Sequence, residues 1–204
     1  EIYYTKREAL PLNEIGLPLR KLSKEVELRH GNAALETSRG CPWNRCTFCS
    51  RANFFKHGWF GYPIERVLRD FENLVEEGVH NVFIIDEDFL GGGLERAQQI
   101  AKAIIARGLA GKVRFAIDTS VASIMAGFDS EGNKKIARET LLLLKQAGLT
   151  RVFLGIESGS TTQLERYAKG IKPQDSVRVI ELIREIGFHL DIDMVIFDPG
   201  VTLE

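Results

Sequence analysis

The sequence has 204 residues, of which 44% are hydrophobic and 27% charged, and its formal net charge is −1. These values are ordinary for a soluble globular protein. Acidic and basic residues are mixed, so the sequence lacks the basic stripe typical of nucleic-acid binding. No apolar run approaches the ~20 residues of a membrane span, and the charged, polar first residues are unlike a signal peptide. We therefore expect neither a nucleic-acid partner nor a membrane.

Two parts of the chain differ in composition. Residues 1–30 contain two prolines and many charges, and they are expected to form an N-terminal approach segment or linker. Residues 31–204 are expected to form one core domain. Because the sequence begins with Glu1 and ends at Glu204 directly after a strand-like segment, we expect a fragment of a longer protein.

Amphipathic helical patterns, each closed by a glycine, alternate with apolar runs. The first pattern repeats apolar residues from Ile64 to Val75, opens with Pro63 and ends at Gly78. Further helices are expected at 94–107, 134–147 and 174–186. Gly91–Gly93 is expected to be a flexible turn. The apolar runs are typical of buried parallel strands, and the expected strands are 33–37, 79–85, 112–117, 151–156 and 190–197.

This strict alternation predicts an α/β fold with a parallel sheet and right-handed crossovers. Five strands fit either a partial (β/α) barrel or a doubly wound sheet, and the alternation does not distinguish them. In both folds the functional residues follow the carboxyl ends of the strands. One of these segments carries the cysteines and the other four carry carboxylates: 38–50, 86–93, 118–120, 157–160 and 198–202.

All three cysteines lie within nine residues, as Cys41, Cys46 and Cys49, with the spacing C-x4-C-x2-C. An odd, clustered set is unlike a disulfide framework and favours a metal site in a reducing compartment, with the cytoplasm as the expected location. Three thiolates can hold three irons of a cubane and leave the fourth iron open to another ligand. Flanking arginines favour the thiolate form.

Other interpretations of the cysteines stay open. A zinc site would need a fourth ligand, which His57 could supply. A plant-type ferredoxin site shares the spacing but requires a fourth cysteine, which the sequence lacks. An open-cluster hydro-lyase like aconitase has no support beyond the cysteines. The alternatives to an open-site cluster enzyme are therefore an iron–sulfur electron-transfer protein and a zinc-stabilised module.

The cysteine segment, Thr37–Pro42 with Phe48 before the last cysteine, resembles the cluster loop of the radical S-adenosylmethionine (SAM) superfamily. The usual spacing in that family is C-x3-C-x2-C, so this sequence has one extra residue in the first interval. Gly155–Gly159 with the later Lys169-Gly170 is similar to the family's strand-four segment. Phe197–Pro199 resembles the strand-five ending of the cobalamin-associated branch.

The resemblance covers residues 33–204 and implies a radical SAM barrel whose last strand is missing here. It implies a [4Fe–4S] cluster on Cys41, Cys46 and Cys49, with SAM on the open iron. Reductive cleavage of SAM would give a 5′-deoxyadenosyl radical that abstracts hydrogen from a small-molecule or peptide substrate, whose identity the sequence does not give. An electron donor such as a flavodoxin or ferredoxin would be required. Cobalamin, where used for methyl transfer, would be bound by a domain outside this chain.

The resemblance also assigns residues at the strand ends. Asp86 or Asp88 is expected to bind the SAM ammonium group, because this segment takes the place of the Gly-Gly-Glu motif of other members. Glu157 and Ser158 are expected to accept hydrogen bonds from the ribose hydroxyls. Phe48 is expected to lie against adenine or near the cluster.

A structural role is the alternative for each of these acids, because carboxylates after strands are often helix N-caps or first-turn acids. Asp118 and Asp198 stand at similar strand ends and are secondary candidates for ligand contact. His57, with Trp59 and Phe60, is a candidate wall of the substrate site.

Overall fold

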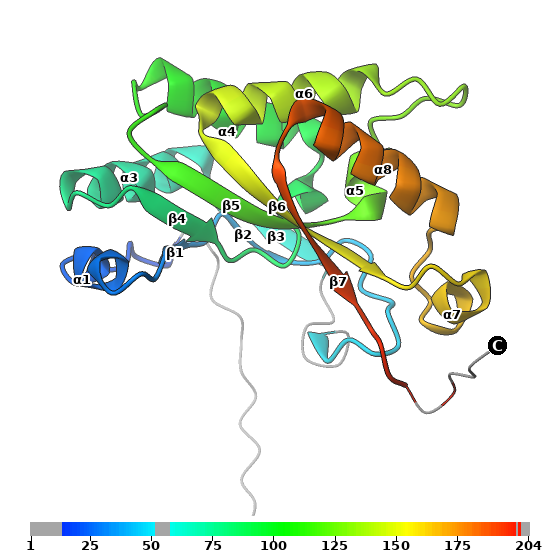
Figure 1. Ribbon diagram of the computed structural model, residues 1–204. Helices are drawn as coiled ribbons and strands as arrows, with labels where there is room; N and C mark the ends of the chain where they lie inside the picture. Colours follow the sequence, from blue (N-terminus) through cyan, green and yellow to red (C-terminus); the bar gives the residue numbers. More distant parts are fainter. Residues whose placement is uncertain (1–13, 52–57, 199, 201–204) are drawn as a thin grey trace, which may run out of the picture.

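A five-stranded parallel sheet forms the centre of the computed structural model, which describes residues 14–51, 58–198 and 200 (Figure 1). Every neighbouring pair of strands in this sheet is parallel. The order across the sheet is β1 (Ala33–Leu35), β4 (Asn81–Ile84), β5 (Arg114–Ser120), β6 (Leu149–Glu157) and β7 (His189–Met194). This order follows the chain without the reversal of a doubly wound sheet. Of the two alternatives, the sheet therefore has the strand order of a (β/α) barrel.

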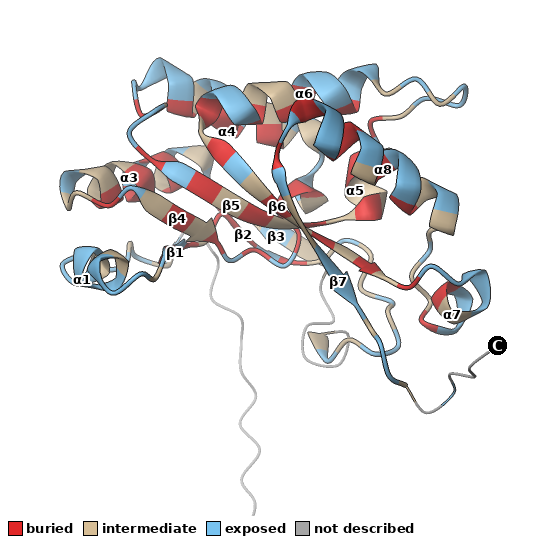
Figure 2. Ribbon diagram, in the orientation of Figure 1, coloured by how far each residue is buried: buried red, intermediate tan, exposed pale blue. Residues whose placement is uncertain are grey.

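The long helices cover one face of the sheet (Figure 1): α3 (Ile64–Glu76), α4 (Leu94–Ala106), α6 (Lys135–Ala147) and α8 (Pro173–Ile186). Crossovers of one hand between successive neighbours put their helices on the same face. Strand residues that point toward the helices, such as Ile117 and Leu154, are fully buried. The alternate residues, such as Asp118 and Phe153, remain partly exposed on the uncovered face. Figure 2 shows the buried residues gathered between sheet and helices.

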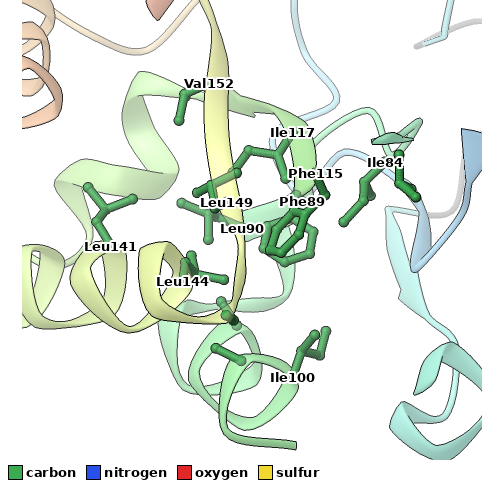
Figure 3. Packing of buried hydrophobic residues seen from close by; sticks show 14 of the residues in the cluster. Ile84, Phe89, Leu90, Ile100, Phe115, Ile117, Leu141, Leu144, Leu149 and Val152 are labelled. Carbon is green, nitrogen blue, oxygen red and sulfur yellow. The ribbon is translucent and has the colours of Figure 1, made fainter. Parts of the chain in front are cut away.

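Aliphatic and aromatic side chains from the strands and from α4 and α6 pack together between these two layers (Figure 3). The strands contribute Phe115, Ile117, Leu149 and Val152, and the helices contribute Ile100, Leu141 and Leu144. On the opposite face, the rings of Phe83 and Phe153 meet across β5 with 5.7 Å between their centroids. The core thus fills the space between the helices and one face of the sheet. On the uncovered face, polar side chains lie at the carboxyl ends of the strands.

The expected strands and helices are present with shifted ends, and short elements add to them. The expected strand 190–197 ends at Met194, because its pairing partner Glu157 is the last residue of β6; the N–H of Val195 still donates to the carbonyl of Glu157 at 2.9 Å. The additional elements are α1 (Ser23–Leu28), β2 (Ser38–Gly40) paired antiparallel with β3 (Trp59–Gly61), η2 (Phe89–Gly92), α5 (Val121–Met125) and α7 (Thr161–Arg166).

The expectation of a flexible turn at Gly91–Gly93 is wrong, because Gly91 and Gly92 belong to the 3₁₀ helix η2. Both glycines pack against the ring of Trp59. A Cβ atom at Gly92 would lie 2.3 Å from a ring carbon of Trp59, so the close approach itself requires glycine. Gly91 and Gly92 therefore serve close packing, whereas Gly93 has a left-handed backbone, with φ at +90°.

The described part of the N-terminal segment contacts the core domain. Arg20 forms an ion pair with the buried carboxylate of Asp70 on α3 at 2.5 Å and donates to the carbonyl of Ala34 at 2.7 Å. Glu27 accepts from the side-chain amide of Asn81 at 2.6 Å. Among the helices of the described residues, none has both the length and the apolar composition needed to cross a bilayer.

Candidate functional site

The three cysteines lie on the loop that follows β2, next to the carboxyl ends of the parallel strands. We call residues 41–51 the cysteine loop. Cys41, Cys46 and Cys49 are free thiols of intermediate exposure. The backbone N–H of Cys49 donates to the carbonyl of Cys46 at 3.2 Å, which closes a turn between the last two. Within 14–51, 58–198 and 200, no three His, Cys, Asp or Glu side chains are placed to hold a single metal ion.

The electrostatic surroundings of the thiols fit a polynuclear iron cluster. Burial raises the pKa of the Cys46 thiol, and the ammonium of Lys169 opposes this effect. The charges of Cys41 and Cys49 raise the pKa of Cys46 further, so the Cys46 sulfur lies within electrostatic range of both other cysteines. Cationic irons bound between the thiolates would relieve their mutual repulsion. The donor set therefore suits the cluster that the sequence predicts.

Glu87, which follows β4, holds both ends of the cysteine loop. Its Oε2 accepts from the backbone N–H of Gly40 at 2.8 Å, and its other oxygen forms an ion pair with Arg51. Gly40 has a φ of +101°, and a Cβ there would lie 2.0 Å from the carbonyl oxygen of Gly58. Glycine is therefore required at the entry to the loop. The sequence places Glu87 with Asp86 and Asp88 among the strand-end acids, one of which is expected to contact a ligand, but it gives Glu87 no role of its own.

Asp86 is buried in the protein interior, with only 1% of its surface exposed. Its carboxylate accepts from the backbone N–H of Thr37 at 2.7 Å, from the Thr37 hydroxyl, and from the Ser38 hydroxyl at 2.6 Å. Burial raises the pKa of Asp86, and these hydrogen bonds act in the opposite direction. Asp86 thereby fixes the turn between β1 and β2, directly before the cysteine loop.

Asp88 is equally buried and connects β4 to the next unit. It accepts from the hydroxyl of Thr119 at 2.8 Å and from the hydroxyl of Ser123 on α5 at 2.7 Å. SAM-ammonium binding by Asp86 or Asp88 stays a prediction. Such binding would require one of these carboxylates to accept a further hydrogen bond, in addition to those that its oxygens already accept from the chain.

Glu157 is the last residue of β6 and has a left-handed backbone, with φ at +69°. Such strained conformations of non-glycine residues concentrate at functional sites. The Oε1 atom of Glu157 accepts from the Nζ atom of Lys169 at 2.9 Å, and both side chains are about nine-tenths buried, with 12% and 11% exposed. The pair lies beside Cys46, whose pKa both charges influence.

Ser158, in contrast, is turned toward α7. The residue is 4% exposed. Its hydroxyl donates to the side-chain carbonyl of Gln163 at 2.5 Å and accepts from the N–H of Ser160 at 3.0 Å. Phe48 is 43% exposed, contacts Tyr167 edge-on at 5.2 Å between centroids, and lies 5.8 Å from the Lys169 ammonium. The structure therefore brings Phe48 and Glu157 together around Lys169, a residue that the sequence resemblance contained without a role.

The two secondary candidates have opposite environments. Asp118 lies on the uncovered face of β5, and its buried Oδ1 atom has no hydrogen-bond partner within the described residues. Burial, with the charges of Asp193 and Asp86, raises the pKa of Asp118 to about 6. Asp198 follows β7, and hydrogen bonds led by that of Tyr167 lower its pKa to about 2.

A small cavity of about 280 Å³ lies beside the cysteine loop, bounded by Pro42, Trp43, Leu90, Gly91, Ser120 and Ser123 among others. Of the predicted substrate wall, Trp59 packs against η2, Phe60 is 51% exposed, and His57 lies outside the described residues. Neither aromatic residue lines this cavity.

Residues 35–204 match the Radical SAM superfamily. The chain belongs to this superfamily, and the sheet of barrel strand order with its cysteine loop agrees with that membership.

The chain is also similar to parts of curated proteins. The chain is 29% identical over 198 residues to 4′-phospho-dehydrooxetanocin synthase of Priestia megaterium, covering 91% of this chain and 26% of that protein. It is 33% identical over 169 residues to an uncharacterized methyltransferase of Pyrococcus horikoshii, covering 82% of this chain and 33% of that protein. The chain thus spans a quarter to a third of these relatives.

Solved structures agree. The cobalamin-dependent SAM radical enzyme OxsB, with aqua-cobalamin and SAM bound, matches 99% of this chain and 29% of its own at a TM-score of 0.86 and 25% identity. The methyltransferase TsrM of Kitasatospora setae, with tryptophan and a SAM analogue bound, matches 88% of this chain and 33% of its own at 0.72 and 19% identity, which supports the fold alone.

Proposed function

We propose that this chain carries the cluster and SAM site of a radical SAM enzyme. The observation that supports this most is the convergence of the cysteine loop, Phe48 and the Glu157–Lys169 pair beyond the carboxyl ends of parallel strands. Superfamily membership gives this convergence its chemical meaning. When bound, the [4Fe–4S] cluster would supply the electron that breaks a carbon–sulfur bond of SAM, giving methionine and a 5′-deoxyadenosyl radical.

The residues of the chain have separate tasks in this proposal. Cys41, Cys46 and Cys49 would each hold one iron, and Glu87 fixes both ends of their loop. The Lys169 ammonium places a positive charge beside the Cys46 sulfur and favours its thiolate form. A carboxylate with one partner can accept further hydrogen bonds. Glu157, already bound to Lys169, is therefore proposed to accept hydrogen bonds from the ribose hydroxyls of SAM.

The wider reaction is proposed from the relatives. The similarity to OxsB and to 4′-phospho-dehydrooxetanocin synthase favours cobalamin-associated chemistry, including methyl transfer, with cobalamin on a domain outside this chain. The radical would abstract hydrogen from a small-molecule or peptide substrate. A flavodoxin or ferredoxin would donate the electron, and the free thiols favour a reducing compartment such as the cytoplasm.

Low-temperature EPR tests this proposal. The protein is reconstituted anaerobically, reduced with dithionite, and measured with and without SAM, alongside Cys46→Ala and a control, Glu185→Gln. Glu185 is an exposed acid paired with Lys134 and Arg138 on the helix layer. We expect a [4Fe–4S]⁺ signal that changes with SAM in wild type and control and is weakened in Cys46→Ala, together with release of 5′-deoxyadenosine.

The alternatives give different results. A colourless protein that retains only zinc would refute the proposal and leave a zinc-stabilised module. A cluster whose EPR spectrum does not change on addition of SAM in any sample would refute SAM binding and favour an electron-transfer role.

A further inference from the structure

The cysteine loop is attached to one short segment, residues 166–170, which we call the α7 platform because it begins at the last residue of α7. The backbone N–H of Thr47 donates to the carbonyl of Tyr167 at 3.0 Å. The hydroxyl of the same Thr47 donates to the carbonyl of Arg166, also at 3.0 Å. Thr47 lies between two cysteines, so these bonds fix the middle of the loop.

Two aromatic side chains extend this attachment. The indole N–H of Trp43 donates to the carbonyl of Ala168 at 2.7 Å, and its ring covers Gly170 so closely that a Cβ there would lie 2.3 Å from a ring carbon. Phe48 contacts the ring of Tyr167 edge-on. The platform therefore contacts the loop in both intervals between cysteines.

The platform is itself held by the segment that follows β7. One oxygen of Asp198, Oδ2, accepts from the Tyr167 hydroxyl, from the guanidinium of Arg166, and from the side-chain amide of Gln163 at 3.1 Å. The other oxygen accepts from the N–H of Gly200 at 2.7 Å. The Asp198 side chain is 15% exposed, so these partners surround it almost completely.

The same platform is connected to the end of β6. Gln163 donates to the Tyr167 hydroxyl at 2.7 Å and accepts from the hydroxyl of Ser158. Tyr167 is the common element, with 4% of its surface exposed and its hydroxyl bound by both Gln163 and Asp198. A change at the end of β7 can therefore reach the cysteine loop through Tyr167 without passing through the sheet.

We propose that Asp198 is a positioning residue for the cluster. It holds Arg166 and Tyr167, and the carbonyls of these two residues hold Thr47 between the cysteine ligands. The geometry of the loop thus depends on the segment after β7, although Asp198 contacts no cysteine in these interactions. This inference rests on the proposed function, because only a cluster gives the loop geometry its purpose.

The test compares Asp198→Asn with the control Glu185→Gln, which neutralises an exposed acid that also accepts from two cations. Two quantities are measured: the rate of iron loss from the reconstituted protein to a chelator, and hydrogen exchange of the loop in protein without cluster. We expect Asp198→Asn to lose iron about tenfold faster, the lower end of what loss of ligand-supporting groups costs in metal affinity. The Thr47 amide should also exchange faster, and Asp198→Glu should restore part of both.

A second variant covers the case in which Asp198→Asn unfolds. Thr47→Val removes only the hydroxyl bond to Arg166 from an exposed side chain, and it too should accelerate iron loss. In the double variant the two effects should combine to less than their product, because they act through one platform.

Iron loss and amide exchange in Asp198→Asn that equal those of Glu185→Gln would overturn the inference, as would fully multiplicative effects in the double variant. If wild type takes up no cluster, the proposed function fails, whereas amide exchange still decides whether Asp198 holds the loop.

Discussion

Replacing Asp118 with asparagine should stabilise the protein without ligands at neutral pH. Asp118 lies on β5, facing the charges of Asp193 and Asp86, and one of its buried oxygens has no hydrogen-bond partner in the part of the chain that the structure describes. Its pKa is raised from 3.8 to about 6, so ionisation is less favourable in the folded chain than in the unfolded chain. The folded state therefore binds more protons between these two values, and stability falls as pH rises through this window.

The magnitude follows from the shift. A difference of about 2 pKa units corresponds to about 3 kcal/mol at about 1.36 kcal/mol per unit. Asp118 is partly exposed, and solvent screening reduces this to about 1–2 kcal/mol. The asparagine side chain cannot ionise, so Asp118→Asn should be more stable than wild type by this amount at neutral pH and similar to it in acid, below the unfolded pKa. The melting temperature should rise by about 2–4 °C per kcal/mol for a chain of this size.

Thermal and urea unfolding at several pH values measure this difference. Asp191→Asn on β7 is the matched control, because Asp191 lies in register with Asp118 two strands away and the hydrogen bond from Arg151 lowers its pKa. That variant should lose stability at neutral pH, with the opposite sign. A gap between wild type and Asp118→Asn that does not change with pH, or a less stable Asp118→Asn at neutral pH, would refute the reasoning.

Three further predictions concern the cysteine loop and the core. Glu87→Gln removes the charge that pairs with Arg51 and should increase iron loss to a chelator about tenfold; an unchanged rate would show that the loop needs no such clamp. Gly92→Ala places a Cβ against the Trp59 ring and should lower the unfolding free energy by about 1–3 kcal/mol in urea titrations, unless η2 can shift freely. Leu141→Ala should cost about 2–5 kcal/mol, since this side chain is 1% exposed, yet leave the EPR signal of the cluster unaltered; a changed signal would contradict the separation of core and site.

The sequence predicts best those elements whose signals are local. The helix around 64–76 has an apolar stripe, an opening proline and a closing glycine, and all three act within a few residues. The strand expected at 190–197 ends earlier, because its continuation depends on the register of β6 rather than on its own residues. Phe197 extends an apolar run in the sequence, yet it is 91% exposed in the structure. Hydrophobicity predicts that a strand exists, but not the residue at which its pairing with the neighbouring strand ends.

The candidate site likewise has parts with a local sequence signal and parts without one. The cysteine loop could be singled out because its three thiols are separated by only a few residues. The partners of Asp86 and Asp88 lie 31 to 49 positions away along the chain, so no local pattern shows that these carboxylates are hydrogen-bonded within the protein. The Glu157–Lys169 pair spans 12 positions and an intervening helix, and only the fold brings it beside Cys46.

The three consecutive acids after β4 show why spacing alone cannot assign their roles. Successive residues of an extended segment point in different directions, so each acid reaches a different part of the protein. Asp86 holds the turn before the cysteine loop, Glu87 holds its two ends, and Asp88 holds the start of the next unit. The α7 platform holds the middle of the loop. The proposed cluster ligands are local in sequence, but the loop that carries them is held by β4, α7 and the segment after β7 together, so substitutions at these supporting residues should alter cluster retention before they alter the fold.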